Sequence, residues 1–182
     1  MQIAPISLTA PLQNLSATIL GAIETIDQGI DFLMQISADD YQRAKPPLVT
    51  SSIGEHCRHV LDIFHALSDY ENGVDYNLRR RGHDVEKTRE LAIVEFQVIK
   101  QWLSQLNSEE MKRVISVKTE VALSETLSAE LTSQLEREVA FAASHATHHY
   151  ALMKVLAIQL GYQTDKELGF APATATYLRE QS

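Results

Sequence analysis

The chain has 182 residues, of which 45% are apolar, so it is long enough for one ordinary domain with a sizeable core. Its formal net charge of −8 argues against general affinity for nucleic acid or anionic membranes. The single cysteine, Cys57, excludes an intrachain disulfide and fits a reducing compartment. Because no signal-peptide pattern and no long apolar run is present, we expect a cytoplasmic protein.

The first two amphipathic segments predict helices near 11–36 and 51–72. The run Thr9-Ala10-Pro11 is typical of a helix start, since proline is tolerated in the first turn. Ser52 and Glu55 have the spacing of a capping box at the start of the second helix. The expected inner face of that helix is formed by Ile53, Val60, Ile63, Phe64 and Leu67.

The second half of the chain predicts two more helices, near 85–106 and 128–161. The candidates for the inner face of the third helix are Leu91, Val94, Val98, Trp102 and Leu106. Residues 113–121 alternate and are rich in β-branched side chains, which indicates an extended segment or a short hairpin. The tail after Gly161 has no clear period and is expected to pack as loop and short turn.

This pattern predicts an all-α protein, with 1–182 forming a single four-helix-bundle domain. A short extended segment before the last long helix is compatible with it. No internal repeat or linker divides the chain.

The last helix carries polar residues where its pattern calls for apolar ones. Spacings of four and three define an inward stripe of Leu131, Leu135, Glu138, Ala142, His145, His149, Leu152 and Leu156. A buried polar side chain without a partner costs roughly 1–3 kcal/mol. His145 and His149 are four residues apart, so both project from one helix face, as two ligands of one divalent metal ion would. The alternative is a pair of core histidines that bond to backbone or water.

The second helix offers two candidates for a third ligand. His56 lies near the centre of its apolar stripe and His59 at the edge, so helical phase favours His56. Glu138 is roughly 10 Å along the helix axis from His145 and is therefore a poor direct ligand. Glu138, and whichever of His56 and His59 is not a ligand, are candidates for moving a proton during catalysis.

The connection after the second helix carries three consecutive arginines. Such a run is usually solvated, but this one follows the histidine-bearing helix closely. Arg79 and Arg81, together with Tyr76, are therefore candidates for binding an anionic substrate. His148 and His65 are expected at the edge of the stripe and at the surface, respectively. Cys57 fits a small core residue better than a reactive thiolate.

Two phrases of the chain, SIGEHCRHVLD and HATHHYALM, resemble the motifs of the DinB-like (DinB/YfiT-like) four-helix-bundle family of candidate metalloenzymes. The resemblance covers most of the chain and implies that His59, His145 and His149 bind one divalent ion. It assigns the third ligand to His59, because Val60-Leu61-Asp62 follow it, whereas helical phase prefers His56. The presence of His56 also leaves ligation by four histidines open.

The resemblance further implies a metal-dependent enzyme, in the first place a transferase that uses a low-molecular-weight thiol, with related hydrolase or isomerase-like chemistry in the wider family. The expected cofactor is a divalent transition metal, namely zinc, nickel or iron. The expected partners are small molecules, with neither nucleic acid nor membrane involved, and a homodimer is compatible with the pattern. The alternative function is a non-catalytic helical-bundle protein that binds a metal or a small ligand.

Overall fold

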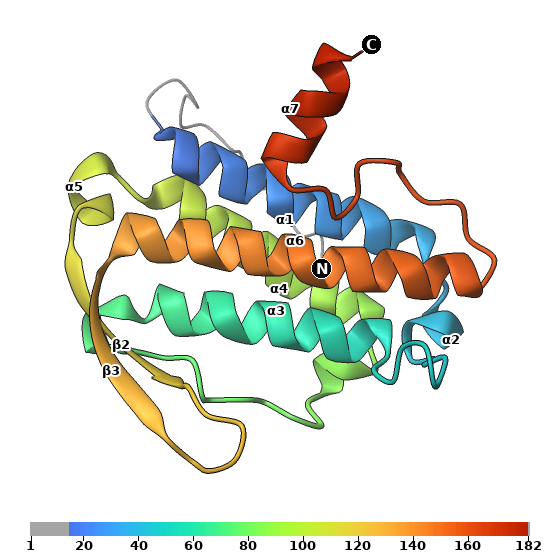
Figure 1. The fold of residues 1–182 in the computed structure, drawn as a ribbon, viewed down its shortest axis with the longest axis horizontal. Coiled ribbons are helices and arrows are strands. Elements are labelled where there is room, and N and C mark those ends of the chain that lie inside the picture. The colour runs from blue at the N-terminus through green and yellow to red at the C-terminus, as the bar shows by residue number, and fades with distance from the viewer. Residues whose placement is uncertain (1–14, 182) are drawn as a thin grey trace, which may run out of the picture.

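The fold is mostly helical in the computed structural model, which describes residues 15–181 (Figure 1). Its four long helices correspond to the four predicted segments. α1 and α3 each pack against both α4 and α6, and the buried apolar side chains form one cluster among them. The helices are α1 (Ala17–Gln35), α3 (Ile53–Ser68), α4 (Arg89–Gln105) and α6 (Leu135–Gln159).

Five shorter helical segments complete the described chain: α2 (Ala38–Tyr41), η2 (Tyr70–Asn72), η3 (Asp84–Glu86), α5 (Ser108–Met111) and α7 (Pro172–Glu180). The expectation that the tail contains no helix was wrong, because α7 forms there and begins with a proline in its first turn. None of the residues of α7 is buried, and in Figure 1 the helix projects from the body of the molecule.

A small sheet corrects the all-α prediction. β1 (Val74–Asp75) pairs in parallel with β2 (Val114–Glu120), which pairs antiparallel with β3 (Ser128–Gln134). The extended segment expected near 113–121 is confirmed as β2. The last helix begins at Leu135 rather than near 128, and Leu131 is an exposed strand residue opposite Val117. The backbone groups of β2 need partners, and 128–134 supplies them by pairing along the strand.

The start of α3 is the part of the fold that local sequence dictates most directly. The hydroxyl of Ser52 accepts from the Glu55 N–H at 3.2 Å, and the Glu55 carboxylate accepts from the Ser52 N–H at 2.7 Å. The predicted capping box is therefore confirmed, and all five residues of the predicted inner face are buried. Gly54 in the first turn allows η3 to approach closely, since a Cβ there would lie 2.0 Å from the carbonyl oxygen of Glu86.

Two further helix predictions need correction. The inner face of α4 is rotated from the expected one: Val94 and Val98 are exposed, and the buried residues are Ala92, Phe96, Ile99 and Leu103. The second helix ends at Ser68, before the short turn η2. The helix start expected at Thr9-Ala10-Pro11 lies outside the described residues, within which α1 begins after the N-cap Ser16.

None of the helices within residues 15–181 combines the length and the apolar character needed to cross a membrane.

Candidate metal centre

Three histidines from two facing helices bring their ring nitrogens together. His59 projects from α3, and His145 and His149 project from neighbouring turns of α6. The Nε2 atom of His145 lies 2.9 Å from Nε2 of His59 and 3.1 Å from Nε2 of His149. Within residues 15–181, this is the one group of three histidine, cysteine or acidic side chains whose ligand atoms all lie within 4.8 Å of one another.

The spacing of these nitrogens fits a single transition-metal ion. Imidazole nitrogens bind such an ion at about 2.0–2.1 Å, so two of them lie roughly 2.9–3.4 Å apart for angles between a right angle and the tetrahedral value. The separations of 2.9 and 3.1 Å fall in that range. The donor set of three imidazoles suits zinc, nickel or iron.

Burial keeps these imidazoles neutral. Burial, followed by the nearby charge of Arg79, lowers the pKa of His59 to about 3. Burial, followed by the neighbouring histidines, lowers the pKa of His149 to about 2, and burial also lowers the pKa of His145. Because a metal ion binds only the neutral ring, the site needs no deprotonation of its histidines near pH 7.

His56 lies behind His149, outside the converging group. Its Nδ1 atom is 2.9 Å from Nδ1 of His149, and burial lowers its pKa. The His56 side chain is buried, and its Nε2 atom makes no hydrogen bond to any part of the chain that the structure describes. The converging set therefore contains His59, as the resemblance implied, while the residue favoured by helical phase contacts a member of that set.

The charged side chain of Arg79 contacts this group. Its Nη1 atom lies 2.7 Å from Nδ1 of His59, on the side of the ring opposite His145. Burial lowers the pKa of Arg79, and Asp62 partly offsets this. Arg81, the other arginine predicted to bind substrate, is exposed. The structure thus brings one of the two arginines to the histidines.

Comparison with known proteins identifies the family. The DinB family matches residues 24–166. The chain belongs to the DinB family. A solved structure of a DinB-like protein, YjoA from Bacillus subtilis, has a similar fold, with a TM-score of 0.57 and 19% sequence identity over 81% of this chain and 94% of that one. No curated protein matches the chain.

Tyr76 and Glu138 meet each other away from the histidines of this DinB-family site. The Tyr76 hydroxyl donates to Oε2 of Glu138 at 2.8 Å, and the Ser133 hydroxyl donates to Oε1 at 2.6 Å. Burial, followed by the Glu138 carboxylate, raises the pKa of Tyr76. The Phe141 ring lies 5.6 Å from that of Tyr76 and 5.8 Å from that of His145. Both Glu138 oxygens are therefore occupied, and an aromatic ring stands between this pair and the histidines.

Asp62 organises the connection that carries the arginines, a role that sequence reasoning missed. Its buried carboxylate accepts from the Arg80 side chain at 2.6 Å, from the Arg80 backbone N–H at 3.1 Å and from Arg58 at 3.2 Å. Arg80 also bonds to Glu95 at 2.8 Å. No local signal marks this role, because Asp62 lies on the side of α3 opposite the apolar stripe, next to Arg58 and His65 on the helix surface. Its contacts fix the backbone next to Arg79.

The remaining candidates lie away from the centre. His148 is exposed, with its ring 5.4 Å from that of His149. His65 contacts Glu95 at 2.9 Å and is partly exposed, so it is less solvated than expected. Burial raises the pKa of the Cys57 thiol to about 12, so this thiol is protonated at neutral pH and fits the predicted core role.

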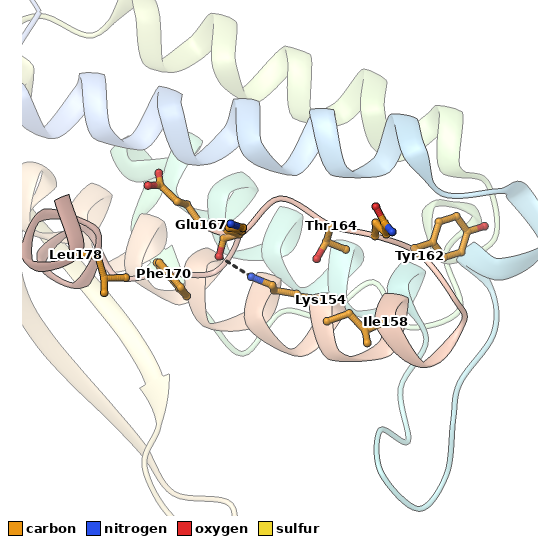
Figure 2. A pocket seen from close by; sticks show the side chains of 9 residues that line it. Lys154, Ile158, Tyr162, Thr164, Glu167, Phe170 and Leu178 are labelled. Atoms are coloured by element: carbon orange, nitrogen blue, oxygen red, sulfur yellow. Dashed lines mark hydrogen bonds between the residues drawn. The ribbon is translucent and has the colours of Figure 1, made fainter. Parts of the chain in front are cut away.

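Cavities of about 350 and 770 Å³ open at the surface of the described structure. The smaller, of about 350 Å³, is lined by Arg79 and Asn77 and by residues 119–123 after β2, so it adjoins the histidines through Arg79. The larger, of about 770 Å³, lies between α6, the following tail and α7 (Figure 2). There Lys154 donates to the carbonyl oxygen of Lys166 at 2.7 Å, and none of the lining residues is a histidine. Of these two cavities, and among residues 15–181, only the smaller is lined by a residue that contacts one of the three histidines.

Proposed function

We propose that this DinB-family protein is a metal-dependent enzyme, a transferase that uses a low-molecular-weight thiol. The observation that carries the proposal is the convergence of three neutral imidazoles, His59, His145 and His149, from two facing helices. Three protein ligands are the number found in catalytic rather than closed structural zinc sites. The proposal places the protein in the cytoplasm, where thiols are kept reduced.

In this proposal the histidines hold a zinc, nickel or iron ion through their Nε2 atoms. A divalent ion held by neutral imidazoles keeps its full charge and supplies Lewis acidity to a thiol or a water molecule. His56 supports the site by contacting Nδ1 of His149, which orients that ring. This contact allows His56 to hold or accept a proton at the edge of the site.

The protein's own arginines also supply contacts for an anionic group of the substrate. Arg79 lines the adjoining cavity, and a guanidinium pairs well with a carboxylate of a thiol or an electrophilic substrate. Arg81, which is exposed, offers a second contact for the anionic group. The hydrogen bond from Tyr76 to Glu138 anchors the segment that leads to both arginines.

The first test is metal content. Protein purified without added metal is analysed by mass spectrometry, as wild type and as the His149→Ala and His65→Ala variants. We expect one transition-metal ion per chain in the wild type and in His65→Ala, and little in His149→Ala. At a free metal concentration 100-fold above the dissociation constant, binding should stabilise the wild type by about 2.7 kcal/mol. Equal metal content in wild type and His149→Ala refutes the metal site.

The second test is activity. Metal-loaded protein is screened with a panel of biological thiols and a chromogenic electrophile, and with hydrolysable esters. Turnover that depends on metal and is lost in His145→Ala supports the transferase. Full metal loading without turnover on any of these substrates points instead to a non-catalytic metal-binding protein.

A further inference from the structure

Arg79 connects the histidine centre to the smaller cavity. Its Nη1 atom contacts Nδ1 of His59 at 2.7 Å, and the same side chain lines the cavity bounded by Asn77 and residues 119–123. The backbone beside it is anchored, because the Arg80 N–H and side chain both bond to Asp62. The Arg79 side chain therefore extends from an anchored stretch of backbone.

The contact between Arg79 and His59 has a chemical consequence. A guanidinium has hydrogen-bond donors and no acceptor, so His59 accepts at Nδ1. A neutral imidazole that accepts at Nδ1 carries its proton on Nε2. The Nε2 atom of His59 is the one turned toward Nε2 of His145. In this tautomer, the nitrogen that faces the other two ligands has no free lone pair.

Coordination of a metal ion through Nε2 of His59 requires the other tautomer, with the proton on Nδ1. Two donors would then face each other across the 2.7 Å that separates Nδ1 from Nη1 of Arg79. His149 differs, because its Nδ1 faces Nδ1 of His56, which can accept a hydrogen bond from the Nδ1–H of His149. The arginine contact and metal binding by His59 are therefore mutually exclusive, whereas the contact between His56 and His149 is compatible with metal binding.

A carboxylate in the cavity is the natural alternative partner for Arg79. Guanidinium groups bind carboxylates through paired hydrogen bonds. The other lining residues include no second basic side chain and a single acidic one, Glu120, which is exposed. Asp62 is unavailable, since both of its oxygens already bond to Arg58 and Arg80.

We propose that Arg79 couples the two sites: it competes with the metal ion for His59, and a carboxylate ligand that binds Arg79 in the cavity strengthens metal binding. By reciprocity, the metal strengthens carboxylate binding by the same factor. The coupling rests on the proposed function only in that the three histidines bind a metal ion. It would make the centre bind its metal most tightly when an anionic substrate is present.

The test measures zinc affinity of the full chain by competition with a chromophoric chelator, at fixed pH, with and without succinate as the carboxylate probe. In the wild type we expect succinate to raise zinc affinity about fivefold or more, a typical size for coupling between sites. In Arg79→Gln we expect tighter zinc binding without succinate and no response to it, because a glutamine oxygen accepts from Nδ1 of His59. Arg179→Gln, which removes the same charge from an exposed side chain of α7, should behave as the wild type.

A second variant separates hydrogen bonding from charge. Arg79→Met removes the same charge but offers no good acceptor, so zinc should bind less tightly to it than to Arg79→Gln. Equal affinities in these two variants, or a wild type that does not respond to succinate, overturn the coupling. The outcome is distinct from failure of the metal site, which would show as zinc binding that His149→Ala leaves unchanged.

Discussion

The hydroxyl of Tyr76 donates a hydrogen bond to the carboxylate of Glu138, with 2.8 Å between the two oxygens. The two residues are 62 positions apart in the sequence, and Ser133 completes the contact by donating to the other carboxylate oxygen. Glu138 is thus the point at which the connection after α3, the end of β3 and the start of α6 are joined. A buried carboxylate with two hydroxyl donors accounts for a polar residue on the inward stripe of α6.

This contact predicts a structural effect for Glu138→Ala. Removing the carboxylate leaves two hydroxyls without their partner, so we expect the free energy of unfolding to fall by about 1–3 kcal/mol, as measured by urea denaturation. Zinc affinity should stay within about twofold of the wild type, since an isolated change away from the ligands rarely couples to them. Glu130→Ala, at an exposed position of β3, is the control. Lost zinc binding with unchanged stability would place Glu138 in the metal centre instead.

Asp62→Ala should have a larger effect. The variant leaves Arg58 and Arg80 without their shared carboxylate, whose side chain is 2% exposed. Breaking a buried ion pair on one side typically costs about 3–5 kcal/mol, and we expect a loss of that order in urea denaturation. Asp31→Ala, an exposed acidic position on α1, should change stability by about 0.5 kcal/mol at most. A change at position 62 as small as the control's would show that the arginines find other partners.

How far the sequence predicts this fold depends on whether the signal is local. α3 was predicted well because its cap and its apolar stripe lie within one segment. The start of α6 was not, since Leu131 continues a helical spacing that only the distant pairing with Val117 overrides. The inner face of α4 was misjudged because apolar residues lie on both sides of this helix, including the exposed Val94 and Val98. Its neighbours, not its own pattern, decide which side is buried.

The same distinction holds at the candidate site. The spacing of His145 and His149 revealed that they share a face, and the structure brings both of them to His59. Helical phase ranked His56 above His59 because His56 lies nearer the centre of the apolar stripe of α3. The histidines of α3 and α6 instead meet at the edge of that stripe, where His59 lies. The role of Asp62 was not predictable from α3 alone, since its partner Arg80 lies in a connection without regular structure.

Acid should destabilise the metal-free protein through the histidine cluster. The folded state keeps His59 and His149 neutral down to a pKa of about 3 and about 2, while the unfolded chain protonates them near their ordinary value of 6.5. Below that value the unfolded state binds more protons, so the free energy of unfolding falls as the pH falls. Urea denaturation in the presence of a metal chelator, between pH 7.5 and 4.5, should show this fall in the free energy of unfolding. In His149→Gln the pH dependence should be shallower by the equivalent of about one bound proton. Identical slopes in the two proteins would contradict the prediction.

The third ligand is decided by comparing His59→Ala with His56→Ala. His59 faces the other two ligand nitrogens directly, so its loss should weaken zinc binding by more than about 100-fold, beyond the 10–100-fold expected when a residue that orients a ligand is removed. His56 contacts only the far nitrogen of His149, so His56→Ala should fall within that smaller range. A 100-fold loss would remove up to about 2.7 kcal/mol of zinc-dependent stabilisation, which thermal or urea unfolding detects. His148→Ala, at an exposed position of α6, should retain wild-type affinity. The reverse order would make His56 the ligand, and equally large losses would indicate four-histidine ligation.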